Sequence, residues 1–476
     1  MMKRLEAIEL PAAEIAHQKM LMREFAAVKD RPHTYYVVTY GCQMNAHDSE
    51  KLAGMLLEMG MTEAESREKA DFVIFNTCCV RDNAQRRALG NVTWLKEIKK
   101  TRPEMMVAVC GCMMQQQGMG EQILRQYPFV DVAFGTHNLY RFAELMLQAV
   151  KSRRRVVEVI QDDEGSIPEE LPVHRSSPYH AYITIMYGCN NFCSYCIVPY
   201  VRGRERSRAS DRIIEEARQL KADGVKEIML LGQNVNSYGL DVEGELSFAQ
   251  LLEKLDEVGI ERIRFMTSHP KDISDELIEV IAKSKHICHA LHLPVQHGST
   301  RVLESMNRRY TREGYLARVR SIRERIPDMS LTTDLIVGYP GETEEEFEET
   351  CSLVSEVGYD SAFTFIYSPR IGTRAASMPD QIPEEVSSRR IQKLIAIQKD
   401  ITRRNYASYI GQIHHVLVEE ASKRDEHQMA GKNEYNITVN FPGDRSLIGQ
   451  IVCVKITSAG ESTLRGEMID TATSNE

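Results

Sequence analysis

Features that this chain lacks exclude several classes of protein. No stretch of its 476 residues approaches the roughly 20 apolar residues of a membrane-spanning helix, so we expect no membrane partner. It contains neither a G-x-x-x-x-G-K-[ST] loop nor a G-x-G-x-x-G turn, the sequence signatures of nucleoside triphosphate and dinucleotide sites. An ordinary nucleotide-dependent enzyme is therefore not expected.

The chain also lacks the excess of positive charge that is usual in proteins that bind nucleic acids. Its formal net charge is -9, which taken alone argues weakly against a phosphate-rich partner. Basic residues are nevertheless concentrated in three short segments, Arg202 to Arg208, Lys151 to Arg155 and Arg81 to Arg87. Each could be a solvated face, but the first and third directly follow cysteines, which favours a shared anionic substrate.

Cysteine is not scarce, and its spacing is informative. The 11 cysteines cluster in short runs, which is typical of reduced metal ligands in a cytoplasmic protein rather than of disulfides. Cys189, Cys193 and Cys196 form C-x3-C-x2-C, and no further Cys or His follows before His269. A structural zinc site would need a fourth ligand, whereas three thiolates can hold an iron-sulfur cluster with one open iron. The open iron indicates chemistry rather than scaffolding.

This motif resembles the signature of the radical S-adenosylmethionine (SAM) superfamily. The aromatic Tyr195 just before the third cysteine also fits that pattern. In that superfamily the open iron binds the amino and carboxyl groups of SAM. The resemblance implies a 4Fe-4S cluster held by the three cysteines.

The first part of the chain predicts an α/β domain. Residues 1–33 have apolar residues at helical intervals and predict a helical extension, and residues 34–150 alternate short β-rich runs with helical stretches. The strands are expected at Tyr35–Thr39, Asp71–Asn76, Met106–Val109 and Val130–Phe134. This repeat predicts a parallel sheet.

Three of these strands lead into cysteine, at Cys42, Cys78 and Cys112. Parallel sheets place ligands at the carboxyl ends of their strands, so the three cysteines could converge on a second cluster. Cys79 should point away from Cys78, and Cys110 lies inside an apolar strand, so we choose Cys78 and Cys112. The alternative is that these cysteines fill the core, as buried cysteines often do.

Residues 151–178 are charged, contain Gly165, Pro168 and Pro172, and predict a linker. Residues 179–406 then predict six strand and helix units, and every strand ends in a polar or Gly-rich turn. In a barrel these turns share the rim where active sites are built. Six units predict a partial, six-stranded βα barrel with one open side. The histidines between His286 and His297 fall on both faces of a strand, so no third metal is expected there.

Residues 407–470 change to short strands with Gly and Asn turns. They predict a small β-barrel, an architecture that often binds RNA. The alternative is a capping domain without a ligand, which the acidic composition of this segment favours.

From about residue 34 to 468 the chain resembles the methylthiotransferases, which combine an N-terminal cluster domain, a radical SAM domain and a C-terminal TRAM domain. The resemblance is carried by several short motifs: Gly41-Cys-Gln-Met-Asn, Asn76-Thr-Cys-Cys-Val-Arg, the cysteine loop from Gly188 to Tyr200, Leu231-Gly-Gln-Asn-Val-Asn, Thr267-Ser-His-Pro and Pro294-Val-Gln. Gln43, Met44, Asn45, Val80 and Arg81 favour the branch that acts on N6-dimethylallyladenosine in tRNA.

The resemblance implies a reaction and its cofactors. One SAM would give a radical that takes hydrogen from C2 of the modified adenosine beside the anticodon, and a second SAM would methylate a sulfur on the auxiliary 4Fe-4S cluster of Cys42, Cys78 and Cys112. A tRNA anticodon stem-loop, a one-electron reductant and a sulfur donor are the expected partners.

The same resemblance suggests further contacts. Expected SAM contacts are Tyr195, Gln233, Asn234, Ser268 and Gln296. Arg202, Arg204 and Arg206 are candidates for RNA phosphates or for the SAM carboxylate. One alternative is a sister enzyme acting on threonylcarbamoyl-adenosine tRNA or a ribosomal-protein aspartate. A distant alternative is a non-catalytic iron-sulfur protein in RNA binding or electron transfer.

Overall fold

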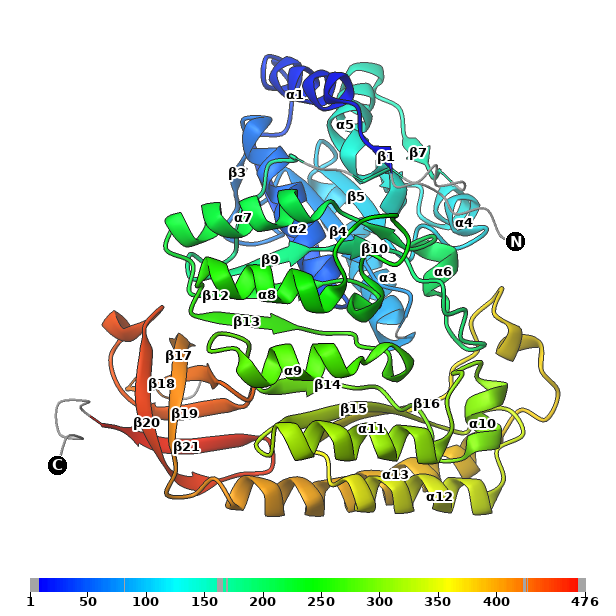
Figure 1. Ribbon diagram of the computed structural model, residues 1–476. Coiled ribbons are helices and arrows are strands. Elements are labelled where there is room, and N and C mark those ends of the chain that lie inside the picture. The colour runs from blue at the N-terminus through cyan, green and yellow to red at the C-terminus, as the bar shows by residue number, and fades with distance from the viewer. Residues whose placement is uncertain are drawn as a thin grey trace.

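A computed structural model describes residues 8–80, 82–160, 166–167, 170–422, 425 and 427–469 (Figure 1). The N-terminal domain lies at the top of Figure 1, the strands of the central domain lie below it, and the C-terminal strands gather at the lower left. The predicted α/β fold class, with three successive domains, is confirmed.

The N-terminal domain is built on a parallel sheet with the strand order β3-β2-β4-β5-β6-β7. Its strands are β2 (Thr34–Thr39), β3 (Thr62–Glu63), β4 (Phe72–Thr77), β5 (Met106–Gly111), β6 (Val132–Phe134) and β7 (Val156–Glu158). Every residue of β4 is buried, as expected of the apolar run at the centre of a parallel sheet. Strand β7 pairs with β6 and lies within the segment expected to be a linker, so the sheet continues past residue 150.

Helices cover both faces of this sheet. They are α1 (Ala12–Ala26), α2 (Gln43–Glu58), α3 (Asp82–Thr101), α4 (Met119–Gln126) and α5 (Phe142–Ser152), with a 3-10 turn at Thr136–Arg141. The expected N-terminal helix is α1, and its Met22 and Phe25 are buried in the same core as Phe142 of α5. Helix α1 is therefore an integral part of this domain. The short strands β1 (Ile8–Glu9) and β8 (Ser166–Ile167) pair with each other.

Six parallel strands form the central domain, as predicted. They are β9 (His180–Thr184), β12 (Glu227–Leu231), β13 (Arg262–Phe265), β14 (Ala290–His292), β15 (Ser330–Val337) and β16 (Ser361–Ile366). They pair as two three-stranded sheets, β13-β12-β9 and β14-β15-β16, which a parallel bridge between Ile263 and Ile287 connects. Strands β9 and β16 are at the two ends of this arrangement, which makes it a partial barrel.

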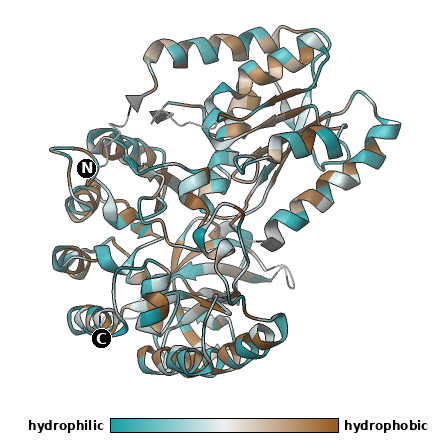
Figure 2. Cartoon of the chain, turned by 90° about the vertical axis from the view of Figure 1, so that its right-hand side faces the viewer, coloured by the Kyte–Doolittle hydropathy of each residue, from teal (hydrophilic) through white to brown (hydrophobic). Residues whose placement is uncertain are grey.

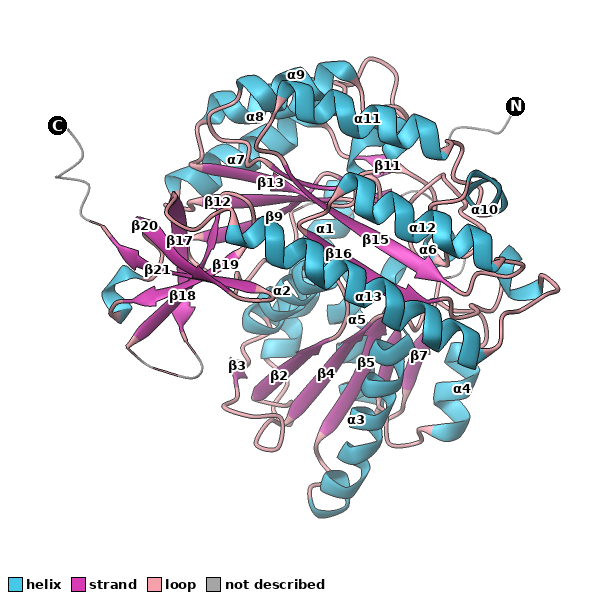
Figure 3. Cartoon of the chain, turned by 90° about the horizontal axis from the view of Figure 1, so that it is seen from below, coloured by secondary structure: helices cyan, strands magenta, loops and turns pink. Residues whose placement is uncertain are grey.

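Helices pack on the outside of the barrel, and a large apolar core lies between the two layers (Figure 3). These helices are α7 (Ser210–Ala222), α8 (Phe248–Val258), α9 (Asp275–Lys283), α10 (Thr300–Ser305), α11 (Arg312–Arg325), α12 (Glu344–Val357) and α13 (Glu384–Ala407). Sequence signals set their ends: α12 begins with a capping box of Thr343 and Glu346 and ends at the left-handed Gly358.

Short elements decorate the rim where the strands end. They are the hairpin of β10 (Met186–Tyr187) and β11 (Arg206–Ser207), helix α6 (Val198–Val201) and 3-10 turns at Val235–Ser237, Pro270–Asp272 and Arg374–Ser377.

The C-terminal segment closes into a small barrel with the order β17-β18-β19-β21-β20. Its strands are β17 (Ile413–Ala421), β18 (Gln428–Asn433), β19 (Thr438–Pro442), β20 (Ile451–Ala459) and β21 (Thr463–Met468), with a 3-10 turn at Arg445–Leu447. Val416, Val439 and Phe441 are fully buried inside it. The predicted β-barrel is confirmed.

Two buried arginines of β13 hold this small barrel against the central domain. Arg262 donates to the backbone carbonyls of His415 and Lys432, and Arg264 donates to those of Asn433 and Glu434. Arg262 is the first residue of β13. The small barrel therefore sits at the amino ends of the central strands, opposite the rim.

Among the described residues, no helix is both long and apolar enough to cross a membrane. The helices in Figure 2 carry hydrophilic and hydrophobic residues side by side along their length. This is the amphipathic pattern of helices that pack on a core with one face.

Candidate functional site

Cys189, Cys193 and Cys196 lie on the loop between β10 and α6, at the barrel rim. A hairpin brings the loop back on itself, and the amide of Cys189 donates to the carbonyl of Gly203 at 3.1 Å. Gly188 has φ +74°, and a Cβ there would lie 1.9 Å from the carbonyl oxygen of Arg204. Only glycine fits this turn, which explains the Gly-Cys start of the motif.

The three thiols of this loop are largely withdrawn from solvent. Burial raises the pKa of the Cys189 thiol to about 12, and it also raises the pKa of Cys196. Without a bound metal the thiols of Cys189 and Cys196 are therefore protonated at neutral pH, and metal binding would displace their protons. The described residues contain no group of three or more His, Cys, Asp or Glu side chains that could hold a single metal ion. A four-iron cluster, in contrast, spreads its thiolates over separate irons.

A buried arginine that the sequence reading missed supports this loop. The Arg308 guanidinium donates to Cys193 Sγ at 3.4 Å, to the carbonyl of Pro294 at 2.6 Å and to the Tyr310 hydroxyl at 2.9 Å. Among the described contacts of its guanidinium none is to a carboxylate, although the residue is only 5% exposed. A buried cation beside a thiol fits an anionic thiolate cluster. Arg308 follows α10 in the sequence Met-Asn-Arg-Arg. This sequence matches no motif from which a functional site could have been predicted.

The predicted SAM contacts all lie near this rim, but they differ in what they do. Asn234 accepts from the His269 amide and donates to Asp272, so its side chain fixes the turns after β12 and β13. Gln296 bridges to β15 through its backbone and has φ +73°. The Tyr195 ring packs against an apolar cluster that includes Tyr339.

Several buried polar atoms at the rim have no hydrogen-bond partner among the described residues. They are Gln233 Oε1, Ser268 Oγ, His269 Nε2 and both amide atoms of Asn236. Buried polar atoms are normally satisfied, so these are suited to the polar groups of a ligand. Gln233 and Ser268 were among the predicted contacts. His269 and Asn236 stand in the motifs that begin at Thr267 and Leu231 but were not singled out.

Cys42, Cys78 and Cys112 come from adjacent strands of the N-terminal sheet. Each follows the end of its strand, and the strands β2, β4 and β5 are direct neighbours. A Cβ on Gly41, which has φ +122°, would lie 2.7 Å from Cys78 Cβ, so the first two chain segments are in close contact. Burial raises the pKa of the Cys112 thiol to about 12, and the nearby charges of Cys78 and Cys42 add to the rise. The carboxyl ends of the strands thus bring the three cysteines together.

The two alternative cysteines point into apolar cores. Cys79 is fully buried beside Val73 and Val109 on one face of the sheet. Cys110 is buried with Ala108 on the opposite face. Cys112 borders the same apolar core as Cys79, and the choice of Cys78 and Cys112 as ligands stays a prediction.

Arg202 joins the central domain to the cysteine site of the N-terminal domain. It follows α6 in the central domain, and its guanidinium donates to Cys112 Sγ at 3.1 Å, to Asn45 Oδ1 at 2.8 Å and to Asp48 Oδ2 at 2.7 Å in the N-terminal domain. Asp48 and Arg202 are both buried. The expected role of Arg202 in binding RNA phosphate or SAM carboxylate does not fit, because its donors are engaged inside the protein.

The other basic residues of this segment also point inward or pack on neighbours. Arg206 donates to the carbonyl of Arg202, Arg208 donates to the carbonyl of Thr184 and to Glu216, and Arg204 stacks on Phe192. Three of these four arginines are buried. These arginines therefore stabilise the protein interior. They do not form the exposed surface for an anionic substrate that the sequence suggested.

The basic run from Lys151 to Arg155 has structural partners too. Arg155 donates to four backbone carbonyls, among them those of Ile123 and Tyr127 at the end of α4, and Lys151 pairs with Glu24 of α1. Arg81 lies outside the described residues. The histidines between 286 and 297 pair separately, His289 with Asp328 and His297 with Glu342.

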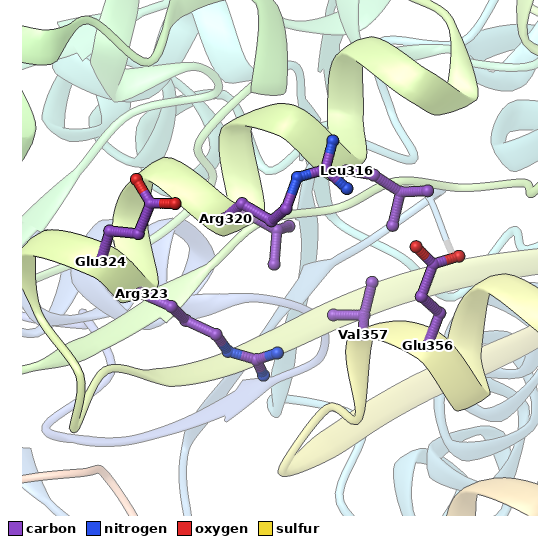
Figure 4. Close-up of a pocket in the computed structure, with 7 residues that line it drawn as sticks. Leu316, Arg320, Arg323, Glu324, Glu356 and Val357 are labelled. Carbon is purple, nitrogen blue, oxygen red and sulfur yellow. The ribbon is translucent and has the colours of Figure 1, made fainter.

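A surface cavity of about 410 Å³ lies between α11 and α12 (Figure 4). It is lined by Leu316, Val319, Arg320, Arg323, Glu324, Glu356 and Val357. Of these residues, Arg323, Glu324 and Val357 lie at the carboxyl ends of the two outer helices that precede β15 and β16. The cavity is thus at the amino-end side of the barrel, away from the cysteine loops.

Models of three families match the chain in order. Uncharacterized protein family UPF0004 matches residues 34–135, the Radical SAM superfamily matches 183–354, and the TRAM domain matches 407–469. A solved structure of similar fold is the radical S-adenosylmethionine methyltransferase TsrM from Kitasatospora setae with cobalamin and a [4Fe-4S] cluster bound. It has TM-score 0.53 and 16% identity and covers 72% of this chain and 74% of that one.

Curated relatives are much more similar in sequence. The tRNA-2-methylthio-N(6)-dimethylallyladenosine synthase of Thermoanaerobacter pseudethanolicus is 50% identical over 96% of this chain and 97% of its own length. The enzymes of the same name from Clostridium botulinum and Clostridium tetani are 52% and 51% identical over 91% and 93% of this chain. The chain belongs to the tRNA-2-methylthio-N6-dimethylallyladenosine synthase family of radical SAM enzymes.

Proposed function

We propose that the protein is a tRNA methylthiotransferase that replaces the C2 hydrogen of N6-dimethylallyladenosine, beside the anticodon, with a methylthio group. The observation that carries this proposal is the presence of two separate three-cysteine sites, each with a buried arginine directed at one of its sulfur atoms. A radical reaction that also inserts sulfur needs two such centres in one enzyme. Near-complete relatives of the same name support the choice of substrate.

Cys189, Cys193 and Cys196 would hold one 4Fe-4S cluster, and Cys42, Cys78 and Cys112 would hold the second. When bound, the first cluster and SAM supply the radical that removes hydrogen from C2, and the second supplies a sulfur that another SAM methylates. The donor chemistry fits, because each site offers three thiols that form no disulfide and one guanidinium directed at a sulfur atom.

The protein's own residues bind, orient and exclude water. Arg202 and Arg308 donate to Cys112 and Cys193, which would stabilise thiolates in a buried setting. Gln233 Oε1 and Ser268 Oγ, which have no hydrogen-bond partner among the described residues, would bind the polar groups of SAM, while Tyr195 and Asn234 would order the surrounding loops. Gln296 would contribute from the loop after β14.

The remaining partners follow from the chemistry. The reaction uses two SAM molecules, an electron from an external reductant and a sulfur atom from an external donor. The TRAM barrel would add RNA contacts at the far end of the central domain. We place the enzyme in the cytoplasm, where tRNA is modified and thiols remain reduced.

The test is an anaerobic reaction of reconstituted protein with SAM, dithionite and an isopentenylated anticodon stem-loop, followed by mass spectrometry of the digested nucleosides. We expect a 2-methylthio nucleoside that disappears in Cys42→Ala and in Cys189→Ala. A threonylcarbamoyl-adenosine stem-loop serves as the parallel substrate. SAM cleavage without methylthiolation of the isopentenylated RNA would contradict the proposed substrate while retaining a radical enzyme.

A further inference from the structure

The strands of the second three-stranded sheet have two faces with different surroundings. Leu331, Leu335 and Val337 of β15 belong to the core beneath the outer helices. Because side chains alternate along a strand, Thr332 and Asp334 must point to the inside of the barrel. The register places His292 of β14 beside Thr332 and Phe363 of β16 beside Asp334. These four side chains therefore share the inner face.

The inner face of the first sheet is covered, whereas that of the second sheet is partly open. Met44 of α2 packs on Met229 and Leu231 of the first sheet. These two residues are only 6% and 4% exposed, respectively. Phe363, in contrast, is 45% exposed although it lies on a strand of the barrel. The N-terminal domain thus fills one half of the barrel interior and leaves an aromatic ring uncovered in the other half.

Hydrogen-bonding groups surround this exposed ring. His292 Nδ1 lies 3.0 Å from Thr332 Oγ1, and its Nε2 lies 3.5 Å from Asp334 Oδ2. The His292 and Phe363 rings are 6.0 Å apart at 74°, so the flat face of Phe363 is not stacked on the histidine. A flat apolar ring beside a carboxylate and an imidazole suits a heteroaromatic base, which has a π face and polar edges.

The open face is continuous with the SAM rim. The Gln296 amide donates to the carbonyl of Asp334 at 2.9 Å, and the Gln296 carbonyl accepts from Ile336. Backbone hydrogen bonds therefore join Gln296, a predicted SAM contact, to strand β15, which carries Asp334. A ligand on this face would lie directly beside the rim where the radical would form.

We propose that Phe363 stacks on the target adenine of the RNA loop, and that the His292–Asp334 pair lies along the edge of that base. The inference rests on the proposed function, and it assigns the position of the nucleobase inside the barrel. A base extruded from a single-stranded loop exposes its two π faces, and one exposed aromatic ring can stack on one of them. Bases that lie outside the barrel would not contact Phe363.

The test is a double-mutant cycle on binding affinity. Binding of metal-loaded protein to a fluorescein-labelled isopentenylated stem-loop is measured by anisotropy at one fixed salt concentration. Phe363→Ala should weaken binding by about 5- to 150-fold, the range for loss of one base–aromatic stack, and Phe363→Tyr should restore most of it. With a stem-loop that is abasic at the target position, wild type and Phe363→Ala should bind equally.

Ile366→Ala is the matched control. Ile366 lies on the same strand, is 37% exposed and pairs with Val337 on the opposite, helix-facing side. Its loss should leave RNA affinity unchanged. Thermal unfolding of the variants checks that each one folds.

The outcomes separate the two proposals. The stacking role is overturned if Phe363→Ala weakens binding of the abasic RNA as strongly as it weakens binding of the intact RNA. It is also overturned if Phe363→Ala has no effect on binding of the intact RNA. If wild-type protein fails to bind and modify the isopentenylated stem-loop, the proposed function itself fails.

Discussion

The two cysteine sites differ in how they are assembled and in how their buried charge is balanced. The Cys189 loop is one short segment of the central domain, and the guanidinium of Arg308 beside it has hydrogen bonds to a thiol, a carbonyl and a hydroxyl but to no carboxylate among the described residues. The second site takes its cysteines from three strands, and the Arg202 beside it is balanced by Asp48. The first site therefore depends on a bound anionic group for its counter-charge, whereas the second has one built into the fold.

The strongest way to separate the two sites is to remove each set of cysteines. We expect triple alanine variants of Cys42, Cys78 and Cys112, or of Cys189, Cys193 and Cys196, to bind about half of the wild-type iron, because each cluster of four irons is independent. Only the second variant should lose SAM cleavage, and both should lose the methylthio product. Iron and sulfide analysis and product chromatography measure this. Full iron in the first variant would refute the auxiliary site.

The next largest effect is expected from removing Asp48, the negative charge that pairs with Arg202 at the second site. Asp48→Leu leaves the Arg202 guanidinium buried and unpaired, and we expect it to destabilise the protein by about 3–5 kcal/mol. Thermal unfolding of the metal-free protein would show the lower Tm. The double variant Asp48→Leu/Arg202→Met should be more stable than Asp48→Leu alone.

Asp30 provides a matched control for this prediction. It lies 3.9 Å from Arg153, and both side chains are largely exposed. Asp30→Leu should change stability by less than about 0.5 kcal/mol, as for most surface substitutions. An equal effect of the two aspartate variants would show that the buried pair has no special role.

Arg308 allows a smaller and more selective change at the first site. Without its positive charge, reduction of a neighbouring cluster becomes less favourable, so Arg308→Met should lower the midpoint potential of the Cys189 cluster. SAM cleavage should fall roughly 10- to 100-fold, as for other outer-shell groups, and Arg308→Lys should recover part of it. Potentiometric titration followed by EPR measures the shift. An unchanged potential in Arg308→Met, or an equal shift in Arg202→Met, would contradict the assignment.

The smallest expected effect is that of Cys79→Ala, and it distinguishes Cys79 from the adjacent Cys78. Cys79 is fully buried in an apolar core, so Cys79→Ala should keep all of the iron and cost about 1 kcal/mol of stability. Cys78→Ala should instead lose about half of the iron, because one cluster then lacks a ligand. Iron analysis of the two variants side by side decides which cysteine is the ligand.

The same comparison shows how much the sequence could predict. Periodicity and turn residues predicted the six central strands and the C-terminal barrel, because each strand is a local apolar run bounded by turns. The neighbouring positions of Cys42, Cys78 and Cys112 were predictable from a topological rule, since neighbouring parallel strands end side by side, whereas their role as ligands stays a prediction. Strand β7 was missed because three residues in a charged segment carry too little pattern to be recognised.

Charged residues were the hardest to place. Arg202 and Arg206 looked like a phosphate-binding run, but their side chains point into the protein. A run of charge in a sequence does not reveal its direction, because that depends on partners such as Asp48, which is far away in the chain. Arg308 and Phe363 were missed for the same reason: their surroundings exist only after the barrel has closed.

The position of Arg202 has a consequence for the exchange of domains between related enzymes. This side chain leaves the central domain and ends on Cys112, Asn45 and Asp48 of the N-terminal domain. A chimaera whose junction lies between these two domains would take Arg202 from one parent enzyme and its hydrogen-bond acceptors from the other. Successful recombination would therefore have to transfer the strand ends at Cys42 and Cys112 together with the segment that contains Arg202, as one heritable unit.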